Sequence, residues 1–290
     1  MDHPLPSPGP RRSDAKELPQ RLRAQLEPLV RPRHARWDPL GLLAVRSLLL
    51  EQLSAWGAVE QHRFNEGAGD GTNLILRLPG QEPALAPLLV AAHYDGPLGS
   101  PGADDNATGL VALLELARRW SAQPPRRPVW LVAFDQEEWG MLGSRALARE
   151  LRASRQRLHL MLSLEMLGYT AATQSYPVAG MQALYGERGD FIALVANTGA
   201  GALLPGLARA MGAHVKTKVL PVPFHGRLLP DVRLSDHSPF WDAGYNAVMV
   251  TDTSFLRNPH YHLPTDRVET LDLPFLAAVI EGLDAALRGI

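Results

Sequence analysis

The sequence has 290 residues, no cysteine, ten histidines and a formal net charge of −1 at pH 7. The lack of cysteine excludes disulfides, thiolate zinc fingers, iron–sulfur clusters and a cysteine nucleophile, so imidazole and carboxylate groups must hold any metal. With 46% hydrophobic and 20% charged residues, the chain is not disordered throughout. The near-zero charge predicts neither nucleic acid nor an anionic membrane as a partner.

The first 16 residues are polar and rich in proline, which predicts a disordered N-terminal lead-in before a single domain at 17–290. The N-terminus contains no apolar stretch of the kind found in secretory signal peptides. No apolar run approaches the ~18 residues that would span a bilayer. These features predict a cytoplasmic protein.

Apolar spacing and turn residues predict strands that alternate with helices. In chain order, the sequence predicts helices 22–30 and 39–56, strands 58–64, 72–78 and 87–92, helix 106–120, strand 128–134, helix 139–151, strands 158–164 and 191–196, helices 203–211 and 236–241, strand 247–251 and helix 273–287. This alternation predicts a single α/β domain with an open, mixed, mainly parallel β-sheet and helices on both faces.

Three of the predicted buried strands run directly into side chains that can bind metal. His93 follows the strand at 87–92, Glu137 and Glu138 follow the strand at 128–134, and Glu165 follows the strand at 158–164. In a parallel sheet these strand ends lie along one edge, where such folds bind their ligands. The three placements together predict a functional site at this edge.

Each of these residues also has a structural interpretation. His93 and Asp95 could form a hydrogen bond at the end of the strand. They could equally be a metal ligand and the carboxylate that orients it. Glu137 and Glu138 fit the first turn of a helix, where the helix dipole favours acids. Two adjacent carboxylates repel each other, however, and are easier to explain if one of them faces a cation.

Asp105, Glu165 and His262 can also be interpreted without a metal. Asp105 and its neighbours could cap the helix that follows, although one acid suffices for a cap. Glu165 interrupts an apolar stretch, and a buried acid costs several kcal/mol unless an arginine or a metal neutralises it. His262 lies in a loop and means nothing alone.

Taken together, the candidates are two imidazoles and three carboxylates: His93, Asp105, Glu138, Glu165 and His262. Such a set suits two zinc-like cations when one carboxylate bridges them. Two ions ~3.5–4 Å apart form a hydrolytic site that lowers the pKa of a bound water. Glu137, next to a ligand but spare, would be the general base that takes the proton from this water.

Five motifs in this order resemble peptidase family M28, which comprises co-catalytic metallopeptidases, including bacterial aminopeptidases and, as a side branch, glutaminyl cyclases. The motifs are HYD at 93–95, GADDNATG at 102–109, FDQEEWGMLGS at 134–144, LSLEMLG at 162–168 and PHYHLPTDRVETLD at 259–272. The similarity extends from about residue 31 to the C-terminus. It implies the α/β fold of the zinc peptidases, which is like that of phosphorylases and hydrolases.

The resemblance implies two zinc ions that share one ligand. His93, Asp105 and Glu165 would hold one ion, and Asp105, Glu138 and His262 would hold the other. Glu137 would be the acid/base.

The resemblance also implies roles around the metals. Asp95 would orient His93, and Tyr261 would polarise the scissile carbonyl, with a packing aromatic as the alternative. Asp236, in the SDHSPF segment at 235–240, would lie beside the substrate cleft.

One position departs from the family, which often has aspartate where this chain has Glu165. The extra methylene moves the carboxylate by about one bond length, whereas metal–ligand distances tolerate only ~0.2 Å. We still expect Glu165 to bind metal, because the argument from a buried acid does not depend on the family.

The function that the resemblance implies is a zinc-dependent exopeptidase of aminopeptidase type, acting on peptides with a metal-activated water; other divalent metals are alternatives. One alternative is a glutaminyl-peptide cyclase, which uses a single zinc. Another is a non-catalytic scaffold of the same fold, but such proteins usually lose ligands, whereas all five positions here carry competent side chains. Substrate preference and oligomeric state do not follow from the sequence.

Overall fold

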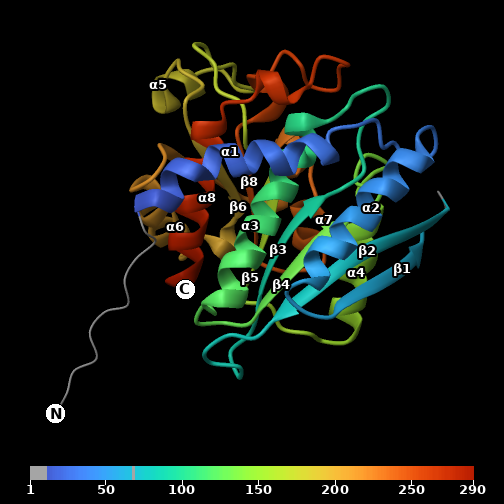
Figure 1. The fold of residues 1–290 in the computed structure, drawn as a ribbon. Helices are drawn as coiled ribbons and strands as arrows, with labels where there is room; N and C mark the ends of the chain where they lie inside the picture. Colours follow the sequence, from blue (N-terminus) through green and yellow to red (C-terminus); the bar gives the residue numbers. More distant parts are fainter. Residues whose placement is uncertain (1–11, 67–68) are drawn as a thin grey trace.

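An eight-stranded β-sheet forms the centre of the computed structural model, which describes residues 12–66 and 69–290 (Figure 1). The strands lie in the order β1-β2-β4-β3-β5-β8-β6-β7. Their bounds are β1 (Val59–Asn65), β2 (Asp70–Leu78), β3 (Leu88–His93), β4 (Val129–Phe134), β5 (Leu160–Glu165), β6 (Ile192–Asn197), β7 (Thr217–Val222) and β8 (Ala247–Thr251).

The strand pairings are mixed, with more parallel than antiparallel neighbours. The pairs β3–β4, β3–β5, β5–β8 and β6–β7 are parallel. The pairs β1–β2, β2–β4 and β6–β8 are antiparallel. The predicted open, mixed, mainly parallel sheet is therefore confirmed.

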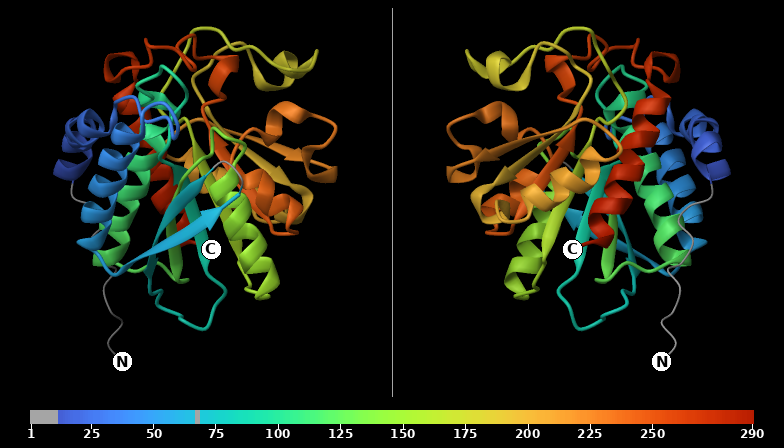
Figure 2. Two further views of the ribbon diagram at one scale, coloured as in Figure 1. Left: turned by 90° about the vertical axis from the view of Figure 1, so that its right-hand side faces the viewer. Right: turned by 90° about the vertical axis from the view of Figure 1, so that its left-hand side faces the viewer.

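Helices cover both faces of this sheet (Figure 2). One layer consists of α1 (Arg12–Leu29), α2 (Pro39–Ser54), α3 (Gly109–Ala122), α6 (Leu204–Gly212) and α8 (Leu273–Arg288), and the other of α4 (Leu142–Ala153) and α7 (His237–Asp242). A short helix, α5 (Met181–Tyr185), lies in the long connection between β5 and β6. None of the helices described is both long and apolar enough to cross a membrane.

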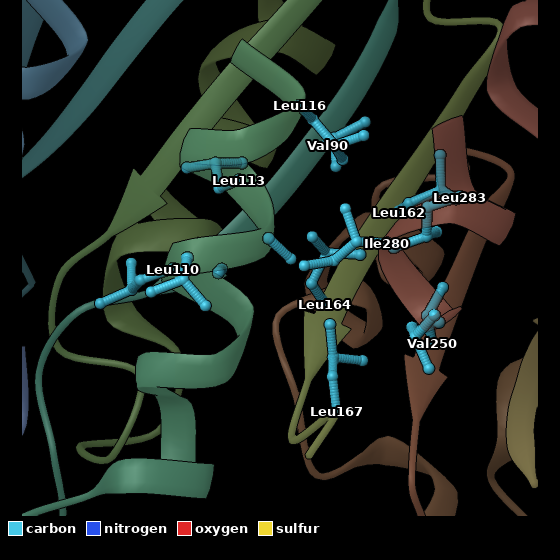
Figure 3. Close-up of a cluster of buried hydrophobic side chains, with 14 of the residues drawn as sticks. Val90, Leu110, Leu113, Leu116, Leu162, Leu164, Leu167, Val250, Ile280 and Leu283 are labelled. Atoms are coloured by element: carbon cyan, nitrogen blue, oxygen red, sulfur yellow. The ribbon is translucent and has the colours of Figure 1, made fainter. Parts of the chain in front are cut away.

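Alternate residues of the central strands face the two layers, which is why these strands are almost continuously apolar. In β3, Leu88 and Val90 belong to the core below α3 and α8, whereas Leu89 and Ala91 belong to the core below α4 and α7. Figure 3 shows part of the first core, where leucines of α3 and α8 meet residues of β3, β5 and β8. His93 and Glu165 follow the same alternation and therefore face the α4–α7 side.

Several boundaries differ from those predicted. Helix α3 begins at Gly109 and not at residue 106, because a π-helical turn, Ala103–Thr108, precedes it. Helix α4 begins at Leu142 and not at residue 139. Helix α1 begins at Arg12, so its first turn falls within the segment 1–16 that was expected to be disordered; residues 1–11 lie outside the described part.

Candidate metal centre and adjoining cavity

Three neighbouring strands bring their carboxyl ends to one place. Strand β3 lies between β4 and β5 in the sheet, and His93 and Glu165 are the last residues of β3 and β5. Glu137 and Glu138 lie in the turn after β4. The parallel pairing of these strands therefore gathers groups that are up to 72 positions apart in the chain.

Asp105 comes from the π-helical turn before α3, where its φ and ψ are not helical. Its neighbour Asp104 is engaged elsewhere: one oxygen accepts from Gly168 N at 2.9 Å and the other from Asn258 Nδ2 at 2.7 Å. The Asp105 carboxylate is left facing two imidazoles, with Oδ1 3.3 Å from His93 Nε2 and Oδ2 3.1 Å from His262 Nε2. The Asp105 carboxylate therefore lies between the two imidazoles and does not cap the helix that follows.

Three groups of side chains in the described residues have ligand atoms close enough together to hold a metal ion: His93, Glu137 and Glu138 form one, and the other two have Asp105 in common. Of these two, His93, Asp105 and Glu165 form one and Asp105, Glu138 and His262 the other, with the atoms of each within 4.8 Å of one another. The Glu165 Oε1–His93 Nε2 distance is 3.7 Å and the Glu138 Oε2–His262 Nε2 distance is 3.5 Å. Ligands of one tetrahedral zinc ion lie about 3.4 Å apart, so both groups have dimensions that suit zinc.

The burial and pairing of these groups also favour a cation. His93 and Asp105 are only 1% and 2% exposed. His93 Nε2 and Glu138 Oε1 are buried and form no hydrogen bond of regular geometry. Within the described residues, no arginine or lysine forms an ion pair with the carboxylates of this cluster. In particular, the arginine partner that would have explained Glu165 structurally is not found there.

Burial and the protein's own charges and hydrogen bonds shift the pKa values of the cluster. Burial, followed by the negative charges of nearby acids such as Glu165, raises the pKa of Glu137 well above its usual value. Burial and the neighbouring Asp105 do the same to the pKa of Glu138. For Asp105, hydrogen bonds from His262 and His93 outweigh burial and lower the pKa. The cluster thus carries more acid than its imidazoles neutralise, and divalent cations would supply the missing charge.

Surrounding side chains fix the ligands through backbone and hydroxyl contacts. Asp95 accepts hydrogen bonds from the backbone N–H groups of Glu137 (3.0 Å) and Glu138 (3.1 Å). His93 Nδ1 lies 3.2 Å from the backbone oxygen of Asp95 and 3.4 Å from its Oδ1. Asp95 therefore contacts His93 as the sequence predicts, and it also shapes the turn that carries the two glutamates.

Two further residues that the sequence did not single out hold the ligands in place. Asp266 accepts hydrogen bonds from the backbone N–H groups of Asp104 (2.9 Å) and Asp105 (3.2 Å). Ser235 Oγ donates to Glu165 Oε2 at 2.7 Å. Their positions inside the motif segments at 259–272 and 235–240 were the only signal available.

Arg33 is a buried cation next to the centre that the sequence analysis missed. Its guanidinium donates to backbone oxygens that include those of Tyr94 (3.0 Å), Gly102 (2.8 Å) and Asp105 (3.2 Å). Gly102 permits this approach: its φ is +64°, and a Cβ there would lie 2.7 Å from the guanidinium. Arg33 thus connects the end of β3 to the turn that carries Asp105, although it lies 72 positions before Asp105.

A cavity of about 290 Å³ opens from the metal centre. Asp105, Glu137, Glu138 and Glu165 line one end of it, and apolar side chains such as Val195 form much of the remaining wall. The carboxylates of the cluster are therefore accessible to a ligand from this side.

Residues 73–286 match the model of peptidase family M28. The chain belongs to peptidase family M28. It is 36% identical over 215 residues to "Uncharacterized protein YfbL" of Escherichia coli K12, covering 69% of this chain and 66% of that protein. It is 29% identical over 186 residues to aminopeptidase YwaD of Bacillus subtilis, covering 63% of this chain and 36% of that protein. The chain thus spans less than two thirds of the length of these curated relatives.

The fold of this M28 protein is also found in a solved glutaminyl cyclase from an Acidobacteriales bacterium. The TM-score is 0.72 with 18% identity, and the alignment covers 99% of this chain and 98% of that one. The predicted resemblance to M28 and its relation to the cyclase fold are both confirmed. The family match begins at residue 73, so Arg33 and the helices α1 and α2 lie outside it.

Two further candidate residues, Tyr261 and Asp236, belong to none of the groups that could hold a metal ion. The ring of Tyr261 stacks on His262 with 3.7 Å between centroids and also lines the cavity, a position that suits both packing and contact with a substrate. Asp236 is fully buried before α7 and neither of its oxygens forms a hydrogen bond of regular geometry. Burial raises the pKa of Asp236 to about 7, and Asp236 does not line the cavity.

Proposed function

We propose that this M28 protein is a zinc-dependent aminopeptidase that holds two zinc ions and hydrolyses the N-terminal peptide bond of its substrates. The observation that supports this proposal is the pair of ligand groups sharing Asp105, with Glu137 beside them at the end of an open cavity. His93, Asp105 and Glu165 would hold one ion, and Asp105, Glu138 and His262 the other. When bound, the two ions would lower the pKa of a water and polarise the substrate carbonyl.

Glu137 is the group that moves the proton in this proposal. Its backbone N–H is held by Asp95 at 3.0 Å, it coordinates in neither of the two groups that share Asp105, and it lines the cavity. Its carboxylate accepts a proton from the water that attacks the carbonyl carbon. It then delivers this proton to the leaving amine nitrogen as the carbon–nitrogen bond breaks.

Glu165 and Tyr261 would position the substrate. A free substrate amino group carries a positive charge, and the Glu165 carboxylate at the end of the cavity can pair with it. The Tyr261 phenol has a pKa above its ordinary value because of burial and the surrounding carboxylates, so it keeps its proton. A protonated phenol can donate a hydrogen bond to the oxygen of the scissile carbonyl.

Replacement of Glu137 by glutamine tests this assignment. We expect hydrolysis of aminoacyl amides to fall by roughly 10²–10⁴-fold while the zinc content per chain stays unchanged, because Glu137 belongs to neither of the two groups that share Asp105. A matched control is Glu269→Gln, at an exposed glutamate in the turn before α8, which should keep full activity. Full activity of the Glu137→Gln protein would refute the role of Glu137.

A second candidate function is glutaminyl-peptide cyclisation with a single zinc, which the alignment with a solved cyclase over nearly both whole chains favours. Two measurements separate the candidates. Two zinc ions per chain and release of N-terminal residues support the aminopeptidase. One zinc per chain and cyclisation of peptides that begin with glutamine support the cyclase.

A further inference from the structure

The cavity that starts at the metal centre ends at a lysine three strands away. Glu165 of β5 pairs in register with Thr251 of β8, Thr251 with Ala193 of β6, and Ala193 with Lys218 of β7. All four residues line the cavity, and in-register neighbours project from the same face of a sheet. Because adjacent strands lie about 4.8 Å apart, the row spans about 14 Å between the Cα atoms of Glu165 and Lys218.

The ammonium group of Lys218 lies against aromatic rings and has no acidic partner. Its Nζ is 4.2 Å from the ring centroid of Phe191 and 6.0 Å from that of Tyr185. Among the side chains described, those of residues 17–66 and 69–290, no carboxylate forms an ion pair within 4.0 Å of this nitrogen. Burial, and then repulsion from Lys216, lowers the pKa of Lys218.

A second lysine, Lys216, lies directly before β7 and, unlike Lys218, forms an ion pair. Lys216 Nζ lies 2.9 and 3.1 Å from the two oxygens of Asp190. Lys216 does not line the cavity. Among the described residues, Asp190 thus forms an ion pair with the lysine outside the cavity, and no carboxylate forms an ion pair with the lysine inside it.

The surface between the metal centre and Lys218 is largely apolar. Val195, Leu220, Val232 and Met249 are among the residues that line it. Besides the acids of the metal centre, the cavity wall contains one further acid, Asp231. Asp231 is exposed and forms no ion pair with Lys218. The cavity therefore has acids at one end, a cation at the other end and apolar side chains between them.

We propose that Lys218 binds a carboxylate of the substrate, so that the enzyme prefers short peptides that present an acid across the cavity from the scissile bond. This inference rests on the proposed aminopeptidase function. The carboxylate has two possible sources, namely an acidic side chain of the N-terminal residue or the free C-terminus of a short peptide. A charged hydrogen bond in a cavity of this kind is worth roughly tenfold or more in affinity over a neutral one.

Two pairs of matched substrates test the proposal with the zinc-loaded protein. The first pair is glutamyl-leucine amide against glutaminyl-leucine amide, which differ only in the charge of the N-terminal side chain. The second pair is leucyl-leucine against leucyl-leucine amide, which differ only at the C-terminus. We expect kcat/KM to be roughly tenfold higher for the acid in at least one pair, and the pair that shows the preference identifies the source.

The variants compared are Lys218→Met, Lys218→Arg and Lys216→Met. Methionine keeps an apolar stem against Phe191 and removes the charge, so the preference for the acid should fall to about one. Arginine keeps the charge and should retain the preference. Lys216→Met, at the lysine outside the cavity, should behave like the wild type.

Binding to metal-free protein, measured by calorimetry with the same four peptides, provides a readout that does not need catalysis. The acid should bind more tightly than its amide to the wild type and equally tightly to Lys218→Met. A preference that survives in Lys218→Met, or no preference in either pair with the wild type, overturns the proposal. If the zinc-loaded wild type hydrolyses none of the peptides, the aminopeptidase function fails, and the calorimetric comparison alone decides the role of Lys218.

Discussion

Buried carboxylates gather at two places in this molecule and meet different partners there. In the helix layer of α1, α3 and α8, Glu115 is fully buried and accepts hydrogen bonds from Arg21, Arg118 and Arg119. At the metal centre, Asp105 and Glu165 are buried and Glu138 is half-buried, yet the ion-pair partners of these three acids among the described residues are only histidines.

The surroundings shift the pKa of Glu115 and those of Glu137 and Glu138 in opposite directions, whereas the pKa of Asp105, which accepts hydrogen bonds from two histidines, is lowered like that of Glu115. Burial alone would raise the pKa of Glu115, but hydrogen bonds from Arg118, Arg21 and Arg119 lower it to about 2. Burial and acidic neighbours raise the pKa of Glu137 and Glu138. Arginines therefore neutralise the buried Glu115, whereas no arginine or lysine of the described residues forms an ion pair with the acids of the candidate metal centre.

Arg33 sharpens this contrast, because it is a fully buried cation beside the metal centre that does not pair with the acids. It donates to backbone oxygens at both ends of the loop 94–105. The nearby carboxylates partly offset the burial that lowers its pKa. Arg33 thus holds the loop 94–105 through backbone oxygens and forms no hydrogen bond with the carboxylates of the centre.

The largest effect is expected for Arg33→Met. This change leaves several buried carbonyl oxygens without donors, and we expect the free energy of unfolding to fall by about 3–5 kcal/mol. Denaturant titration measures this fall. The control is Arg36, which is exposed in the connection between α1 and α2 that also contains Arg33. Arg36→Met should change the free energy of unfolding by less than about 0.5 kcal/mol. A loss below about 1 kcal/mol for Arg33→Met would show that the loop holds its shape without the guanidinium.

The second largest loss of stability is expected for a change at Glu115, the acid that accepts hydrogen bonds from arginines. Glu115→Gln weakens hydrogen bonds from three arginines, two of which are partly exposed, so we expect a loss of about 1–3 kcal/mol. Zinc content and hydrolysis should stay unchanged, because Glu115 belongs to the other acid cluster. Chemical denaturation and metal analysis of the same sample check both points, and altered zinc content would contradict the separation of the two clusters.

Residue patterns in the sequence were sufficient to predict which side chains the structure brings together at the candidate metal centre, but not the residues that hold those side chains in place. His93 and Glu165 could be placed because apolar strands that end in polar residues meet at one sheet edge. Arg33 could not, because it acts on backbone oxygens of a distant loop, and such contacts have no side-chain pattern in the sequence. Asp266 and Ser235 act in the same way, on backbone N–H groups and on a ligand's second oxygen.

The elements that were missed have similar physical reasons. Strand β7, Thr217–Val222, lies at the sheet edge, contains Lys218 and Pro221, and is only partly buried, so it lacks the apolar run of a central strand. Helix α5, Met181–Tyr185, has only five residues and none of them is buried. The early starts predicted for α3 and α4 fall in the turns that carry Asp105 and Glu138, where the site and not helix propensity determines the backbone.

A smaller effect of opposite sign is expected at the metal centre. In the metal-free protein, Glu138→Gln removes an acid whose pKa is raised by burial and by Asp105. We expect unfolding free energy to stay the same or to rise by up to about 1 kcal/mol, in contrast to Glu115→Gln. Zinc per chain should fall from two to one. Destabilisation of the metal-free protein by Glu138→Gln would mean that this acid is structural, like Glu115.

The smallest effect is a difference in the pH dependence of stability, below about 1 kcal/mol per pH unit for each cluster. The folded pKa of Glu115 lies below its unfolded value, so its contribution is present above about pH 4.5 and is lost as the pH falls toward 2. The folded pKa values of Glu137 and Glu138 lie above their unfolded values. In the metal-free protein their contribution is therefore present below about pH 4.5 and is lost as the pH rises.

The opposite shifts of Glu115 and of Glu137 and Glu138 should place the stability maximum of the metal-free protein near pH 4.5, and Asp105, whose pKa is also lowered, adds to the acidic side. Glu115→Gln should flatten the acidic side alone, and Glu138→Gln the other side alone. Zinc binding requires deprotonated ligands, so the zinc-loaded protein should gain stability where the metal-free protein loses it. Thermal unfolding of both forms from pH 3 to pH 7 measures these slopes. Identical slopes with and without zinc above pH 4.5 would remove the distinction between acids that the chain neutralises and acids that await a metal.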